Sequence, residues 1–238
     1  YADSDNNRIA AVDCVVGAGC VATGRYSDEL GSSQLFTTST TDGTWGPYTD
    51  VASPPNTGTD STVIPNSLSC TDMSNCVATG TYGSRTSSVT QFVLVEKSGT
   101  WGSAEAVRMP SGLVQKNNPD FYRPPTVSCG DGFTCIATSW GYATSNLAVS
   151  RPLFVMVTNG TVATAAAVLL PTGTVLDARA QSDITVVSCQ SAGHCLTSGT
   201  YYDANRVQYS FVQTQTNGAW TRAVKLAQPS DAHRIYGY

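Results

Sequence analysis

Hydrophobic residues in this chain occur in short runs that suit β-strands, and polar segments containing glycine, asparagine or proline separate the runs. A representative stretch contains four such runs, at residues 63–70, 76–82, 91–96 and 100–109, and β-branched and aromatic residues are frequent in them. Runs of this kind between turn residues are typical of strands, and helical periodicity is absent throughout the chain. The pattern predicts an all-β protein built from four-stranded antiparallel meanders.

The four-strand pattern occurs four times, and each copy is marked by two cysteines with five residues between them. The cysteine pairs are Cys14/Cys20, Cys70/Cys76, Cys129/Cys135 and Cys189/Cys195. The first cysteines of successive pairs lie 56, 59 and 60 residues apart. A nearly constant period of this length indicates one supersecondary unit repeated four times.

Four antiparallel strands followed by a link to the next four are typical of a β-propeller blade. We therefore expect one domain, a four-bladed β-propeller with blades at residues 8–54, 63–110, 124–171 and 184–229, and with 230–238 as a tail or an extra strand. A β-sandwich or a β-solenoid is the alternative fold. A sandwich does not need four copies of one meander, however, and solenoid coils are usually shorter.

The eight cysteines form even, local pairs, which favours disulfide bonds and an oxidising compartment. Zinc is the alternative, but zinc ligands are usually closer in sequence, and each site needs four of them. We predict four bonds, each joining the two strands of the first hairpin of its blade: Cys14–Cys20, Cys70–Cys76, Cys129–Cys135 and Cys189–Cys195. Because the chain starts at Tyr1 with no signal peptide, we read it as a mature, secreted protein.

A glycine-containing turn follows the third strand of every copy. The four turns are Asp42-Gly43-Thr44-Trp45, Ser98-Gly99-Thr100-Trp101, Asn159-Gly160-Thr161-Val162 and Asn217-Gly218-Ala219-Trp220. They resemble degenerate Asp-boxes of sialidase-type propellers, and the hairpins with their cysteine pairs resemble secreted actinobacterial propellers of the dispase autolysis-inducing protein type. The resemblance implies a secreted bacterial propeller, and it brings no catalytic motif. We expect the three tryptophans to lie in the core between blades.

In an antiparallel meander, successive loops lie at opposite edges of the sheet. The cysteine hairpins and glycine turns share one edge, and the loops between second and third strands share the opposite edge with the links between blades. Irregular loops on a rigid scaffold usually carry function, and aromatic rings with polar neighbours suit a sugar or a peptide. The candidate ligand-binding residues on this loop edge are Arg85, Phe121, Tyr122, Arg123, Trp140, Tyr142, Asp203 and Arg206.

Catalytic chemistry finds little support in the sequence. His194 and His233 are the only histidines, so a Ser-His-Asp triad or a histidine metal site is not expected, and no catalytic residue is assigned. The leading hypothesis is a lectin-like binding module for carbohydrate or for a cell-envelope or extracellular protein. A sialidase-type glycoside hydrolase and a protease-interacting scaffold or inhibitor are the alternatives.

Charge and hydropathy limit the partners. The net charge is −4, which gives nucleic-acid binding little electrostatic support, and the longest apolar run, residues 165–170, is too short to span a membrane. We expect no cofactor, with an ion in the narrow central channel as the alternative. We expect a monomer, and half of an eight-bladed dimer is the alternative.

Overall fold

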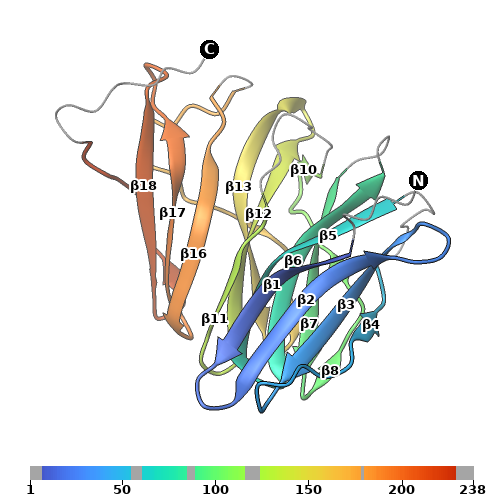
Figure 1. The fold of residues 1–238 in the computed structure, drawn as a ribbon. Coiled ribbons are helices and arrows are strands. Elements are labelled where there is room, and N and C mark those ends of the chain that lie inside the picture. The colour runs from blue at the N-terminus through green and yellow to red at the C-terminus, as the bar shows by residue number, and fades with distance from the viewer. Residues whose placement is uncertain (1–6, 55–60, 85–88, 116–123, 178–179, 229–238) are drawn as a thin grey trace.

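The computed structural model describes residues 7–54, 61–84, 89–115, 124–177 and 180–228 of the 238-residue chain. The described residues form strands and turns and contain no helix, and the strands make four antiparallel sheets (Figure 1). Each sheet is a meander whose first hairpin carries a disulfide bond. The prediction of an all-β, four-bladed propeller with disulfide-linked hairpins is therefore confirmed.

The strands fall into blades in chain order. Blade 1 contains β1 (Arg8–Val15), β2 (Gly19–Ser27), β3 (Ser33–Thr40) and β4 (Thr49–Val51). Blade 2 contains β5 (Ser61–Asp72), β6 (Asn75–Ser84), β7 (Thr90–Lys97), β8 (Thr100–Trp101) and β9 (Glu105–Ala106). Blade 3 contains β10 (Leu113–Val114), β11 (Val127–Gly130), β12 (Thr134–Ala143), β13 (Asn146–Thr158), β14 (Thr161–Val162) and β15 (Ala166–Ala167). Blade 4 contains β16 (Asp183–Ser191), β17 (His194–Tyr202), β18 (Gln208–Thr216), β19 (Ala219–Trp220) and β20 (Val224–Lys225).

The outer strand of blade 2 differs from the single strand that its sequence predicts at residues 100–109. β8 and β9 both pair with β7, and residues 102–104 between them leave the ladder. The N–H group of Gly102 donates to the carbonyl of Val95 at this break, 2.9 Å away. Blades 3 and 4 have the same break, and β10 adds a short strand beside β12 that the sequence did not predict.

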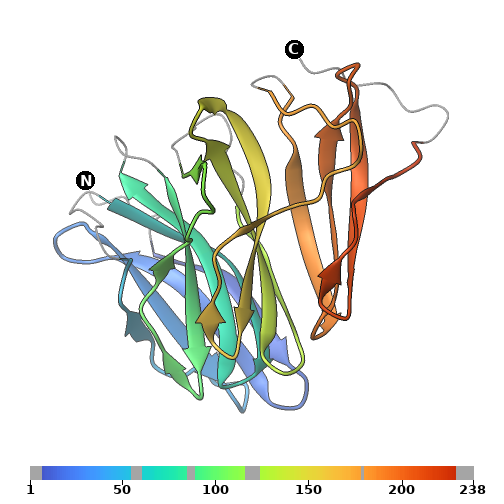
Figure 2. The same ribbon diagram turned by 180° about the vertical axis from the view of Figure 1, so that it is seen from behind.

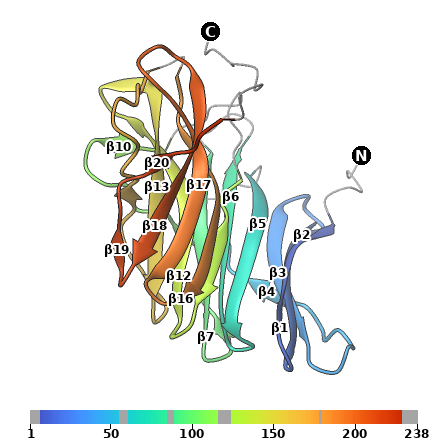
Figure 3. The same cartoon turned by 90° about the vertical axis from the view of Figure 1, so that its left-hand side faces the viewer.

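The blades stack side by side, and their first strands lie next to one another. β1 packs against β5, β5 against β11, and β11 against β16. Figures 1 and 2 show the result as an arc with blade 1 at one end and blade 4 at the other, and Figure 3 shows the same order from the side. Among the described strands, none of blade 4 packs against blade 1.

Each blade has two faces, which we name by the neighbour they meet. The N-side face turns toward the preceding blade and, in blade 2, presents Cys76, Ala78 and Phe92; the C-side face turns toward the following blade and presents Val77 and Val93. Side chains directly opposite one another on paired strands share a face. The core of the molecule therefore consists of three layers between blades. Burying a valine, leucine or phenylalanine there stabilises the fold by about 1.5–3 kcal/mol per side chain.

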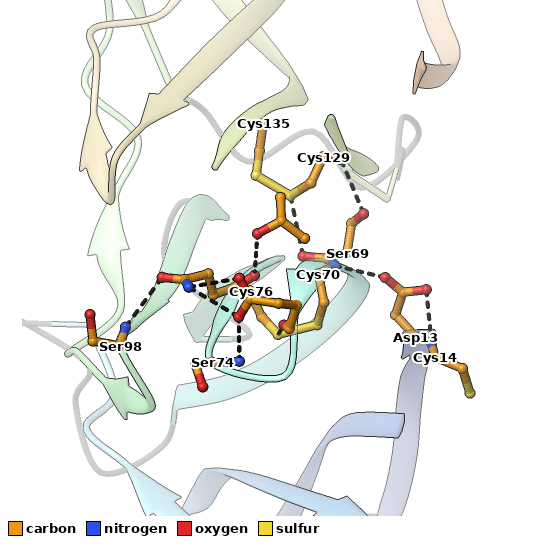
Figure 4. The surroundings of a disulfide bond; sticks show 12 residues. Asp13, Cys14, Ser69, Cys70, Ser74, Cys76, Ser98, Cys129 and Cys135 are labelled. Carbon is orange, nitrogen blue, oxygen red and sulfur yellow. Dashed lines mark hydrogen bonds between the residues drawn. A yellow bond between two sulfur atoms is a disulfide. The ribbon is translucent and has the colours of Figure 1, made fainter. Parts of the chain in front are cut away.

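The disulfide hairpins and the glycine turns lie on the same edge, as the meander pattern predicts. The N–H group of Gly99 donates to the carbonyl of Ser74 in the cysteine hairpin (2.9 Å), and Gly218 donates in the same way to Gly193 (3.0 Å). Figure 4 shows this edge around Cys70 and Cys76, with Ser74 and Ser98 on the two turns. The constant features of the repeat are thus collected at one edge of the arc.

Hydrogen bonds also link the first cysteine of a blade to the blade before it. The N–H group of Cys70 donates to Asp13 Oδ2 (2.7 Å), and that of Cys129 donates to Ser69 Oγ (3.0 Å), as Figure 4 shows. The N–H group of Cys189 donates to Ser128 Oγ (2.9 Å). The acceptor in each case is the side chain directly before the first cysteine of the preceding blade, so one polar link is repeated at all three interfaces.

The tryptophans of the glycine turns differ in burial. Trp101 and Trp220 are half-buried against the cores between blades, as expected. Trp45 is exposed, so the expectation that it lies in the core is wrong. The reason is its position: the tryptophan packs toward the preceding blade, and no described blade precedes blade 1. No helix long and apolar enough to cross a membrane occurs in the described part of the chain.

Candidate functional site

Four of the eight residues predicted to bind a ligand lie on strands or turns of the loop edge that the structure describes. Trp140 and Tyr142 are on β12, and Asp203 and Arg206 are in the turn between β17 and β18. Arg85, Phe121, Tyr122 and Arg123 lie outside the described residues. The two described groups belong to different blades, Trp140 and Tyr142 to blade 3 and Asp203 and Arg206 to blade 4.

The end of β12 is fixed by the neighbouring blade. The buried side chain of Gln91 in blade 2 donates from Nε2 to the carbonyl of Trp140 (3.2 Å), and its Oε1 accepts the Trp140 N–H group (3.4 Å). Tyr142 is buried, while Trp140 is half-buried. This region therefore presents part of the Trp140 ring and little of Tyr142.

Asp203 and Arg206 have structural partners in their turn. Asp203 Oδ1 accepts the N–H groups of Asn205 (2.9 Å) and Val207 (3.0 Å), which closes the turn. Arg206 Nη2 lies 2.7 Å from Asp177 Oδ2 and forms an ion pair with it at a partly exposed position. The turn is thus ordered by its own charges, and an anionic ligand at Arg206 would compete with Asp177.

A groove that was not among the predicted sites lies between blades 3 and 4. Its volume is about 410 Å³, which is within the usual range for small-ligand sites. Blade 3 contributes large apolar side chains from β12 and β13 and small ones from the segment around β14 and β15, and blade 4 contributes two glutamines from β18 and a tryptophan from β19. The lining residues are Ile136, Phe154, Met156, Ala163, Thr164, Ala166, Ala167, Leu169, Gln213, Gln215, Gly218 and Trp220.

Aromatic and apolar side chains make up the floor and walls of this groove. The rings of Phe154 and Trp220 stack in parallel across the interface, with centroids 4.3 Å apart and planes 10° from each other. Met156 and Leu169 are both exposed at the groove. Exposed apolar side chains beside a concave surface favour a ligand with an apolar face.

Two glutamine side chains supply the polar groups of the groove. Gln213 and Gln215 are more than nine-tenths buried, and their Nε2 atoms donate to the carbonyls of Thr221 (2.6 Å) and Gly218 (3.1 Å). Neither Oε1 atom has a hydrogen-bond partner among the described residues. A buried acceptor without a partner costs about 1–3 kcal/mol, so a donor from a ligand would relieve a cost already present in the fold.

None of the described residues that line the groove is charged. Among the described residues, no group of three or more histidine, cysteine, aspartate or glutamate side chains is placed to hold a metal ion.

Outside the groove, in blade 1, Tyr26 donates its hydroxyl to Asp50 (2.8 Å). This hydrogen bond, with smaller contributions from burial and nearby negative charge, raises the pKa of Tyr26 to about 12. That shift disfavours the tyrosinate, which is the form a nucleophilic tyrosine would need.

The sequence contains a signal for the groove in the way blade 4 departs from the repeat. The positions of Gln213 and Gln215 are occupied in blade 2 by Leu94 and Glu96, as the pairing of each with the cysteine strand shows. Two long amides therefore replace the repeat's usual side chains on one N-side face. Aligning the third strands of the four copies would have revealed both positions.

The sequence matches no protein-family model and no curated protein. Among solved structures, a Hadza microbial sialidase aligns with a TM-score of 0.53 at 10% identity over 93% of this chain and 48% of its own. A Penicillium chrysogenum α-L-arabinanase complexed with arabinobiose gives 0.53 at 12% identity, over 99% of this chain and 71% of its own. An ulvan lyase gives 0.50 at 10% identity, over 98% and 60%. This chain spans about half the length of the sialidase, and the likeness to these proteins is one of fold.

Proposed function

We propose that this chain is an extracellular carbohydrate-binding module whose ligand site is the groove between blades 3 and 4. The observation that carries the proposal is the combination of an apolar groove of about 410 Å³ with two buried amide oxygens that have no hydrogen-bond partner in the described part of the chain. The structural neighbours include carbohydrate-active propellers, and four disulfide bonds support an oxidising location.

The chemistry of the groove suits a sugar ring. A pyranose or furanose has an apolar C–H face, which packs on exposed side chains such as Met156 and Leu169, and hydroxyl groups, which donate to acceptors. Gln213 and Gln215 offer amide oxygens at the blade 4 wall. Because these oxygens are buried, a small opening between the blades accompanies binding.

The uncharged lining that the structure describes favours neutral sugars. A sialic acid or a uronic acid would place a carboxylate against described side chains that include no arginine or lysine, and an unpaired charge in an apolar site is costly. We therefore infer neutral oligosaccharides, for example of glucose, mannose, xylose or arabinose units. The loop edge with Trp140 and Arg206 remains the alternative location for the same function.

The test is a titration of the intact chain with a panel of these neutral oligosaccharides by isothermal calorimetry. The variant Gln213→Leu, combined with Gln215→Val, removes both amides and copies residues that other blades carry at these positions, Leu94 and Val157. We expect binding to fall at least about tenfold, the loss for one or two hydrogen bonds, while the fold is retained.

Gln228→Leu is the matched control, because Gln228 is an exposed amide of the same blade outside the groove. It should bind as the wild type does. Unchanged binding in the double variant, with loss in Trp140→Ala, would place the site on the loop edge instead. A wild-type chain that binds no oligosaccharide of the panel would overturn the carbohydrate function.

A further inference from the structure

The two end faces of the arc carry the same kinds of side chain that elsewhere form the cores between blades. The N-side face of blade 1 and the C-side face of blade 4 have no blade against them among the described residues (Figures 1 and 3). Each has counterparts in the other blades at the same positions of the repeat.

On blade 1, Val12 pairs with Ala22 on the N-side face and is 50% exposed. Its counterparts in blades 2, 3 and 4 are Leu68, Val127 and Val187, which are 7%, 7% and 5% exposed. The aromatic pair of this face is repeated too: Tyr26 and Phe36 have ring centroids 6.3 Å apart, and the buried pair of blade 4, Tyr201 and Phe211, 6.4 Å. Blade 1 thus presents an interblade face to solvent.

On blade 4, Leu196 of the C-side face is 44% exposed. Its counterparts, which follow the second cysteine in the other blades, are Val21, Val77 and Ile136, and they are 2%, 0% and 1% exposed. Val186 and Val224 lie on the same face and are also exposed. These three side chains are apolar, while Asp183, which pairs with Thr200, places one carboxylate on the same face at the start of β16.

The polar link between blades is open at both ends as well. The first cysteines of blades 2, 3 and 4 each donate an N–H group to a side chain of the blade before. The N–H group of Cys14 donates instead to its own neighbour, Asp13 Oδ1 (3.0 Å). Ser188, which occupies the acceptor position in blade 4, is exposed. The donor on one end face therefore matches the acceptor on the other.

We propose that the end faces join two copies of this chain head to tail, with the C-side face of blade 4 of one copy on the N-side face of blade 1 of the other. The contact continues the interface that already joins the blades within the chain. Val12 and Leu196 would meet there, as Leu68 and Val21 do between blades 1 and 2. A head-to-tail contact closes when its rotation allows, and two such contacts give a two-fold symmetric ring of eight blades.

This inference is independent of the carbohydrate function, and its test is the oligomeric state. Light scattering coupled to gel filtration, across micromolar to submillimolar concentrations, should give twice the 25.0 kDa of one chain. Leu196→Lys and Val12→Lys each place an ammonium group in the proposed contact, and each should weaken association at least about tenfold, because a buried unpaired charge is costly. Both residues are exposed within one copy, so the fold should be kept.

Leu30→Lys is the control, because Leu30 is exposed in a blade 1 loop outside both end faces. It should associate as the wild type does. A wild-type chain that is monomeric at all concentrations would overturn the proposal. A dimer that persists in both lysine variants would also overturn it, because the two copies would then meet elsewhere.

Discussion

The interface between blades 1 and 2 and the groove between blades 3 and 4 use the same positions of the repeat and differ in what those positions hold. In blade 2, Leu94 and Glu96 lie on the N-side face beside Trp101, and Leu94 is fully buried in the core. In blade 4, Gln213 and Gln215 occupy these positions beside Trp220, and the space in front of them is hollow. The strand pairing is the same in the two blades, and two side-chain differences thus accompany the change from a packed core to a groove.

The opposite wall of each interface carries a buried valine at the same position of the repeat. Blade 1 faces blade 2 with Val51, and its counterpart in blade 3, Val168, is buried against blade 4. Blade 3 faces the amides of blade 4 with Ala163, Ala166 and Ala167, which are too short to fill the space. A repeated scaffold can therefore acquire a site where long polar side chains on one blade meet small side chains on the next.

The largest loss of stability is expected from substituting the second-strand glycine that blades 2 and 4 share. A Cβ atom on Gly80 would lie 2.5 Å from Phe92 Cζ and against the carbonyl of Ile64, and one on Gly199 would lie 2.8 Å from Phe211 Cζ and against the carbonyl of Asp183. Gly80→Ala and Gly199→Ala should each lower the free energy of unfolding by about 3 kcal/mol or more, because the backbone must move. Denaturant unfolding measures the loss.

Blade 3 provides the control for this prediction. Ser139 occupies the glycine position there and pairs with Leu153 instead of a phenylalanine. Ser139→Ala should change the free energy of unfolding by less than about 1 kcal/mol, since the site already holds a Cβ atom. An equally large loss at Ser139, or a small one at both glycines, would show that the two blades do not depend on this close contact.

The next largest loss of stability is expected from removing a disulfide bond, and it should be the same in blade 2 and in blade 4. The bonds of blades 2 and 4 join cysteines six residues apart, so each closes a loop of the same size. Replacing both cysteines of either pair by alanine should cost roughly 2 kcal/mol, the loop-closure entropy of so short a loop. A much larger loss in one blade, seen by thermal unfolding, would mean that the sulfur atoms there matter more for packing than for loop closure.

The sequence is sufficient for the parts of this fold that depend on local pattern. Runs of β-forming residues, the cysteine spacing and the glycine turns predict the blades, the disulfide bonds and the edge on which they lie. The exposed Trp45 could not be predicted in this way, because its burial depends on a neighbouring blade. The groove depends on how blades 3 and 4 face each other, and its residues on β13 and β18 are far apart in sequence, so only the departure of Gln213 and Gln215 from the repeat indicated it.

A smaller, pH-dependent effect is expected at Glu96, the blade 2 counterpart of Gln215. Burial, and to a lesser extent the charge of Asp72, raises the pKa of Glu96 from 4.5 to about 7, and its Oε2 atom has no partner among the described residues. The folded state therefore binds more protons than the unfolded state between these values, so stability falls as the pH rises from about 4.5 to 7. Because the site is partly screened by solvent, the loss should be about 1–2 kcal/mol.

The variant Glu96→Gln places the blade 4 residue in blade 2 and removes the titration. It should be more stable than the wild type at pH 8 by about 1–2 kcal/mol and should differ little from it at pH 4.5. Urea unfolding across this pH range measures the difference. Parallel pH profiles for the two proteins would show that Glu96 is ionised in the folded state without cost.

The smallest change in stability should come from filling the groove. Ala163 is half-buried on the blade 3 wall, and Ala163→Leu would add apolar volume to a space that is empty in the chain alone. Because no well-packed neighbour has to move, the free energy of unfolding should change by less than about 1 kcal/mol, while oligosaccharide binding falls sharply. Ala106→Leu is the control, at a half-buried alanine of blade 2 that lies outside the groove, and it should leave binding unchanged. If Ala163→Leu still binds the oligosaccharide, the groove is not the ligand site, and blades 3 and 4 would then differ from blades 1 and 2 in packing alone.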